Sequence, residues 1–235
     1  MNTSSHAGPS LRAASFGPGG SALVRLLSSD QRARIARMAT VDELPPRRIV
    51  CREGSNAQSV FILAEGVVKM FRDLPSGRGR VLAFLFADDA FGLAQTGYYA
   101  YSVQTITHVK LYRLRLAALT AALRRDGDLA FQFLCKVMHE LRGTLRHNVI
   151  LARRDAVGRA AMFLLMLEQN TPAREDSRIE LPMSRADVAN YLGLSQEAVS
   201  RALTGLERGG VIAFQGRHEL RVLDRARFEK IAGAL

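Results

Sequence analysis

The sequence predicts an α+β protein in which a small β-structured part precedes a helical part. Between Leu44 and Leu114, short apolar runs alternate with turn-forming residues, as in a small antiparallel barrel or jelly roll. From Leu116 to about Asn170, apolar residues instead recur with a helical period. Two short helices around a glycine follow near the C-terminus. Strands and helices are thus segregated along the chain, which favours the α+β class.

Length and composition exclude several classes of protein. The 235 residues favour one large or two modest domains, and 48% of them are hydrophobic, enough for a core of ordinary size. The best apolar run, residues 160–167, is far shorter than the roughly 18–20 residues of a membrane-spanning helix. No secretory signal is visible, and Cys51 and Cys135 do not make a disulfide framework. We therefore expect no membrane partner and a cytoplasmic location.

The charge balance fits a polyanionic partner without locating it. The chain has 33 basic and 22 acidic residues, a net charge of +11, and strongly basic chains commonly bind nucleic acid. The excess is spread as +5 over residues 1–110, +4 over 111–150 and +2 over 151–235. Charge alone therefore identifies no binding face.

The N-terminal half predicts an arm, a helix and then strands. Residues 1–21 are rich in Gly, Ser, Pro and Ala and predict a mobile arm. Residues 23–38 alternate apolar and basic side chains at helical spacing, with a break near Ser28–Asp30. Strands are predicted at 48–51, 60–63, 67–71, 81–86 and 102–114. The expected domains are the arm 1–21, a β-roll with flanking helices 22–125, a long helix 126–152 and a C-terminal domain 153–235.

The long helix that follows Asp126–Asp128 carries an apolar seam, and Asp128 is its expected N-cap. At alternating steps of three and four, the seam contains Phe131, Leu134, Met138, Leu141, Leu145 and Asn148. One interpretation is a face buried against its own domain, and the other is a dimerisation helix. An Asn in such a seam is costly inside a fold but useful for fixing the register of a partner helix. We therefore favour the dimer interface.

The most informative segment, residues 184–207, predicts two short helices joined by a tight turn. Ser184 begins a Ser-x-x-Asp pattern and is the expected N-cap of the first helix, and Ser195 is that of the second. Gly193 permits the positive φ that the turn needs. The residues expected to face inward are Val188, Ala189, Leu192, Val199, Leu203 and Leu206. A small residue four before this glycine and an apolar one six after it are typical of a helix-turn-helix, with a chance helical hairpin as the alternative.

Four polar residues near the start of the second helix suit contacts with DNA bases. They are Gln196, Glu197, Ser200 and Arg201. Arg can donate two hydrogen bonds to guanine, Glu can accept one from cytosine and Ser can serve several bases. Alternatively, Glu197 and Arg201 at i and i+4 form a surface ion pair, and both interpretations can hold together.

A hairpin is predicted after the second helix, with strands at 211–214 and 219–222. This is the wing of a winged helix-turn-helix, and it places Arg217 for a phosphate contact. The expected DNA-contacting set is completed by the two capping residues, Ser184 and Ser195.

These features together resemble the CRP/FNR superfamily of transcription regulators over roughly residues 22–235. They are Arg52-Glu-Gly54, Glu65-Gly66, Phe91-Gly92, the long helix and the segment from Leu181 to Arg201. The resemblance implies a cyclic-nucleotide-binding-like β-roll, a dimerising helix and a winged helix-turn-helix. It also implies that Glu197, Ser200 and Arg201 contact a TTGAT-like half-site, as in the FNR and FixK branches. The cyclic-AMP branch has Arg in place of Gln196 and Gly in place of Ser200.

Departures from the family limit the ligand. Cyclic-AMP binders follow Phe-Gly with Glu and later use Arg-Ser or Arg-Thr on the phosphate, whereas this chain has Leu93 and then Tyr101-Ser102. Cyclic-AMP binding is therefore not expected. Two cysteines cannot supply the four thiolates of an iron–sulfur cluster. Haem stays open, with His108, His139 and His147 as available ligands, although each residue is more often an ordinary polar side chain.

The cysteines are expected to be inert. Cys51 lies on a predicted strand and belongs to the core. Cys135 flanks the seam, where a buried thiol is favoured over a redox switch. The resemblance therefore leaves open a regulator with no small ligand, controlled by its own abundance.

We expect a sequence-specific transcription regulator that binds double-stranded DNA as a homodimer at a palindromic, TTG-containing operator. The resemblance also implies RNA polymerase as a partner. The alternative, from another class, is a ligand-binding β-roll that acts through protein contacts alone. No enzyme activity and no cofactor are expected, because no nucleophile–base set, phosphate loop or metal-ligand cluster stands out.

Overall fold

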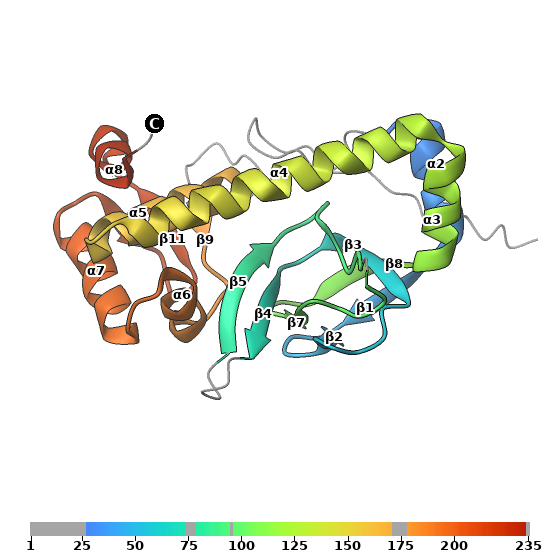
Figure 1. Ribbon diagram of the computed structural model, residues 1–235. Helices are drawn as coiled ribbons and strands as arrows, with labels where there is room; N and C mark the ends of the chain where they lie inside the picture. The colour runs from blue at the N-terminus through green and yellow to red at the C-terminus, as the bar shows by residue number, and fades with distance from the viewer. Residues whose placement is uncertain (1–26, 74–78, 95, 171–177, 234–235) are drawn as a thin grey trace, which may run out of the picture. The chain divides into compact units, whose positions relative to one another are not determined.

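The computed structural model describes residues 27–73, 79–94, 96–170 and 178–233. Their contacts divide into two compact units. The first contains the described residues up to 139 except 71–83, and the second contains 71–83 and the described residues from 140 onward. The element order, mostly strands and then mostly helices, confirms the α+β class (Figure 1). The predicted arm, residues 1–21, lies outside the described residues.

The β-roll consists of two four-stranded sheets. Its strands are β1 (Ala39–Leu44), β2 (Ile49–Cys51), β3 (Ser59–Glu65), β4 (Val68–Asp73), β5 (Gly79–Leu85), β6 (Ala90–Phe91), β7 (Ser102–Thr105) and β8 (Val109–Arg115). One sheet has the order β1-β8-β3-β6 and the other β2-β7-β4-β5. β3 and β8 run antiparallel at the centre of the first sheet, with Ile62 opposite Tyr112. Ile62 and Leu63 of β3 are both fully buried, because this strand is covered on both faces.

The strands differ from the sequence prediction in two ways. The predicted strand 102–114 is divided at Ile106–His108, because β7 and β8 belong to different sheets. β1 and β6 are absent from the prediction. β1 is an edge strand with a largely exposed acidic sequence, and β6 has only two residues, so neither gives a clear apolar pattern.

Two helices, α2 (Ser29–Met38) and α3 (Leu116–Arg125), both pack against the first sheet (Figure 1). Ser28 and Gln31 form a reciprocal capping box at the start of α2, so this helix begins at the predicted break. The predicted helical residues 23–26 lie outside the described residues. The core joins these helices to the roll and to the start of α4 (Gly127–Ala152). Its members include Ile35, Val60, Leu114, Leu119, Leu129 and Phe133.

The N-cap of α4 is Asp126, so the prediction of Asp128 is wrong. The carboxylate of Asp126 accepts a hydrogen bond from the N–H of Leu129 at 2.9 Å. Asp126 has the extended backbone of a cap, φ −132° and ψ 97°, because it also ends α3. Asp128 instead lies inside the first turn of α4.

The C-terminal region is a winged helix-turn-helix. Its elements are α5 (Ala156–Asn170), β9 (Arg178–Glu180), α6 (Arg185–Leu192), α7 (Gln196–Arg208), β10 (Ile212–Phe214), β11 (Glu219–Val222) and α8 (Arg225–Ala232). α5 packs on α7 and α8 through buried residues such as Phe163 and Leu167. β9 adds a third antiparallel strand to the predicted hairpin, in the order β10-β11-β9. None of the helices in the described ranges is long and apolar enough to cross a membrane.

Candidate nucleic-acid interface

Local hydrogen bonds build the helix-turn-helix as the sequence predicts. The hydroxyl of Ser184 accepts from the N–H of Asp187 at 3.1 Å and donates to its carboxylate at 2.7 Å, which caps α6. Gly193 ends this helix in the left-handed region, with φ +63°. The N–H of Leu194 then donates to the carbonyl of Ala189 at 2.9 Å, closing the turn. All six residues expected to face inward are buried.

The start of α7 presents a continuous polar face. Ser195 caps the helix by accepting from the N–H of Ala198 at 3.1 Å. Opposite the buried side of α7, the four residues Gln196, Glu197, Ser200 and Arg201 are exposed. Positions separated by one, four and five residues share one side of an α-helix, so a single groove can receive all four side chains. We call these four residues the recognition face.

Glu197 is held as a carboxylate acceptor within the recognition face. Hydrogen bonds from its own N–H and from the Ser195 hydroxyl lower its pKa, and the charge of Arg201 contributes a smaller effect. Over the residues that the structure describes, Glu197 and Arg201 form no direct ion pair. The surface ion pair considered from the sequence is therefore not the arrangement seen here, and the Arg201 guanidinium keeps its donors for another acceptor.

The wing carries Arg217 at an exposed tip. β10 and β11 pair with Ile212 opposite Val222 and Phe214 opposite Leu220. The N–H of Gln215 donates to the carbonyl of Glu219 at 2.8 Å, which closes the tip. Sequence reasoning missed Arg185, whose guanidinium lies over the ring of Phe214 on the wing. A basic residue at the first position of α6 is a weak sequence signal, because its aromatic partner lies in a different element.

Within the described residues, the apolar side chains of the α4 seam are about half exposed. Phe131, Leu134, Met138, Leu141 and Leu145 are between 47% and 60% exposed, and Asn148 is also exposed. The opposite side of the first turns is buried in the β-roll through Leu129 and Phe133. The interpretation of the seam as a face buried against its own domain therefore fails.

Two tyrosine hydroxyls bond to backbone groups around the loop after β6. Gly92 has φ +87°, and its N–H donates to the hydroxyl of Tyr101 at 3.3 Å. The Tyr99 hydroxyl likewise donates to the carbonyl of Ser59 at 2.9 Å. Leu93 is 43% exposed. Where cyclic-AMP binders of the resembled family have a carboxylate, this chain has the apolar Leu93. Where they have the phosphate-binding arginine, it has Tyr101, whose hydroxyl is bonded within the roll.

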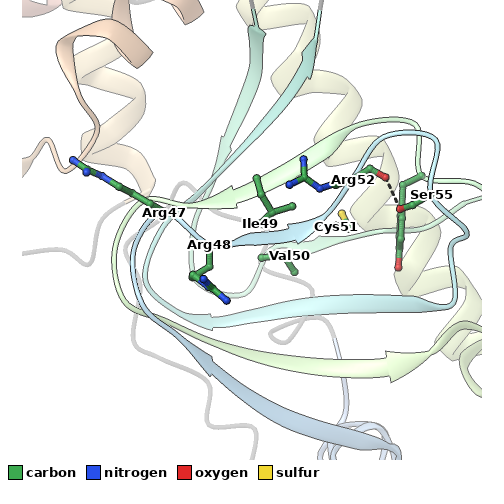
Figure 2. Close-up of a pocket in the computed structure, with 8 residues that line it drawn as sticks. Arg47, Arg48, Ile49, Val50, Cys51, Arg52 and Ser55 are labelled. Atoms are coloured by element: carbon green, nitrogen blue, oxygen red, sulfur yellow. Dashed lines mark hydrogen bonds between the residues drawn. The ribbon is translucent and has the colours of Figure 1, made fainter.

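A depression of the roll has Cys51 in its lining. It is lined by Arg47, Arg48, Ile49, Val50, Cys51, Arg52, Ser55 and Tyr99. Figure 2 shows the three arginine side chains pointing in different directions, so they do not converge on one anion. Burial raises the pKa of the Cys51 thiol to about 11, which keeps it protonated and unreactive near neutral pH. Cys51 is a core residue, as predicted.

The histidines are described in part. The Nε2–H of His147 donates to the carbonyl of Tyr191 at 2.8 Å, and the two rings stack with centroids 3.9 Å apart. Burial lowers the pKa of His147. These contacts fit an ordinary, satisfied polar residue. The side chain of His139 lies outside the described residues. Within the described ranges, no group of three or more His, Cys, Asp or Glu could hold a metal ion.

Comparisons with known proteins match both halves of the chain. Residues 158–231 match the Crp-like helix-turn-helix domain, and residues 41–126 match the cyclic nucleotide-binding domain. The nitrogen fixation regulation protein FixK of Bradyrhizobium diazoefficiens is 33% identical over 178 residues, 75% of either chain. FixK of Azorhizobium caulinodans is 29% identical over 218 residues, 90% of this chain and 88% of the relative. The structure of FixK2 from Bradyrhizobium japonicum has a TM-score of 0.78 at 28% identity, covering 84% of this chain and 98% of that one.

Proposed function

Because the chain belongs to the CRP/FNR family of DNA-binding transcription regulators and is FixK-like, we propose that it binds a palindromic operator whose half-sites contain TTG. The family consists of regulators rather than enzymes, and DNA binding occurs through the helix-turn-helix. The match over residues 158–231 leaves no support for a β-roll that acts through protein contacts alone.

One observation carries the operator proposal, the recognition face at the start of α7. In this proposal Arg201 donates to the guanine of the TTG, Glu197 contacts the complementary strand and Ser200 lies near a neighbouring thymine. The lowered pKa of Glu197 favours its role as an acceptor from cytosine, and the unpaired Arg201 suits guanine O6 and N7. Arg217 on the wing contacts a phosphate, and the caps Ser184 and Ser195 complete the proposed DNA-contacting set.

The proposed form is a homodimer joined through the seam. Its support is the line of half-exposed apolar side chains along α4. A two-fold dimer on a palindromic operator presents its two recognition helices about one DNA turn, roughly 34 Å, apart. RNA polymerase is a further proposed partner, in keeping with a regulator of transcription.

Operator binding in this proposal needs no small ligand. Leu93 and the hydrogen bond between Tyr101 and Gly92 support it, because neither a ribose acceptor nor a phosphate cation is provided. The occupancy of the operator would then be set by the abundance of the protein rather than by an effector.

Selection of bound sequences from random DNA duplexes tests the proposal. The full-length protein is used without added ligand, and the enriched sequences are read out. We expect inverted repeats containing TTG, and a variant with Arg201→Ala should lose the enrichment at the guanine. Enrichment of unrelated sequences would contradict the operator, and enrichment only after a ligand is added would contradict ligand independence.

A further inference from the structure

Phe214, the last residue of β10, is held by side chains from both helices of the helix-turn-helix. Its N–H donates to Oε1 of Glu207, near the end of α7, at 3.2 Å. The guanidinium carbon of Arg185, the first residue of α6, lies 5.1 Å from the centroid of its ring. One residue of the wing is therefore joined to both the supporting and the recognition helix.

The contact with Phe214 explains the position of Arg185. Burial lowers the pKa of this arginine, so the charged guanidinium is partly desolvated. Its Nη1 is buried without a hydrogen-bond partner among the described residues. Such a position is unfavourable for a side chain with five donors, unless another interaction offsets the loss of water. A cation over an aromatic ring is stabilised most when it is desolvated, which is the arrangement that Phe214 provides.

The wing tip begins directly after Phe214 and ends at His218. At His218, the N–H of Leu181 donates to the carbonyl at 2.7 Å, and Nδ1 of the ring lies 3.1 Å from the carbonyl of Leu181. The segment between these two anchored residues contains Arg217. Leu181 lies between β9 and α6, so His218 is tied to the segment that leads into α6, while Phe214 is tied to α6 and α7 themselves.

We propose that Arg185 and Glu207 are positioning residues that act through Phe214 to hold Arg217 at a fixed distance from the recognition face. This inference rests on the proposed function, since it assigns the two residues a role in binding the operator. With Phe214 held, the phosphate contact of the wing forms without further ordering of the hairpin. With Phe214 released, Arg217 loses its phosphate while the base contacts of α7 persist.

Double-variant cycles on the full-length protein test the proposal. The variants are Phe214→Leu, Arg185→Gln, Arg217→Ala and the pairs that include Arg217→Ala, each bound to the operator recovered by selection across a range of salt concentrations. The slope of log K against log salt is negative, and loss of one phosphate contact makes it shallower by about 0.9 per subunit. We expect this change from each single variant. Each pair should bind within about twofold of Arg217→Ala alone, because the effects share one contact.

Two further measurements separate positioning from general damage. The ranking of operators with single-base changes should be the same for Phe214→Leu as for the wild type, because the recognition face is untouched. Phe214→Tyr keeps the ring and should restore wild-type affinity and salt slope. Glu207→Gln keeps an acceptor for the Phe214 N–H and leaves the Phe214 ring in place. This variant should therefore retain most of the operator affinity.

The outcomes distinguish this inference from the proposed function. If Arg185→Gln and Arg217→Ala weaken binding independently, Arg185 contacts DNA itself and the positioning role is wrong. If Phe214→Leu changes the preference at the guanine, the residue supports α7 rather than the wing, which also contradicts the inference. If the wild-type protein selects no TTG-containing operator, the proposed function fails first and this inference fails with it.

Discussion

Charged residues in the seam of α4 should convert the proposed dimer into folded monomers. Leu141 and Leu145 are 50% and 55% exposed in the single chain, so about half of each side chain is left for a partner to cover. Complete burial of a leucine is worth about 1.5–3 kcal/mol, so the four leucines of a dimer contribute about 3–6 kcal/mol. With both residues replaced by Glu, the dimer dissociation constant should rise by about 10²- to 10⁴-fold.

Sedimentation of Leu141→Glu/Leu145→Glu measures this directly, and circular dichroism checks that the monomers are folded. Operator binding should weaken too, because two linked half-sites become separate ones. Leu223→Glu is the matched control. Leu223 is 57% exposed but lies outside α4, so its replacement should leave dimerisation unchanged. If the double variant sediments as an unaltered dimer, the seam is not the interface and the reasoning from its exposure is refuted.

Four other outcomes follow from the structure. Millimolar cyclic AMP should tighten operator binding less than tenfold, about 1.4 kcal/mol of coupling, and a larger effect would contradict the reading of the roll. Arg201→Ala should cost about 1–3 kcal/mol per half-site and relax preference at the guanine alone, whereas Arg217→Ala should weaken all operators alike, as measured by competition with every single-base variant. Gly193→Ala should lower the free energy of unfolding in urea by about 1–2 kcal/mol, because φ is +63° there. Hydrogen bonding from the Leu129 N–H, and to a smaller extent Arg34, lowers the pKa of the Asp126 carboxyl in the folded protein. The ionised carboxylate therefore stabilises the fold above its ordinary pKa, and this stabilisation is lost as pH falls through the lowered folded pKa. Asp126→Asn should therefore show a weaker loss of stability in acid titrations than the wild type.

The recognition face was predictable because its causes are local. Ser184, Gly193 and Ser195 set the helix ends through hydrogen bonds within a few residues, and the inward positions follow from helical spacing. Once those are fixed, the exposed side of α7 is determined. The contact between Arg185 and Phe214 was not predictable, because it joins residues from separate elements through tertiary packing. The roles of these side chains on DNA stay predictions.

The fold was predictable where apolar patterns are strong. β3 and β5 have continuous apolar sequences, and the structure has both strands. β1 was not predicted, because an edge strand needs few apolar residues and so gives no clear apolar pattern in the sequence. An N-cap residue has an extended backbone. The sequence allows this backbone at Asp126 and at Asp128, and the structure has it at Asp126. The domain boundaries at 125/126 and 152/153 remain predictions.

Along α4 the side chains differ in what covers them, and this difference bears on the proposed dimer. Lys136 is only 3% exposed, and its ammonium pairs with Asp89 in the turn before β6. Since a buried ammonium is costly unless it is paired, this contact fixes the rotation of the helix on the β-roll and turns the seam outward. Residues 141–146 are exposed on every side. A helical segment without cover is marginal in water, so the proposed dimer would stabilise residues 141–146 by covering the seam, whereas His147 and Ile150 further along α4 are already packed within the chain.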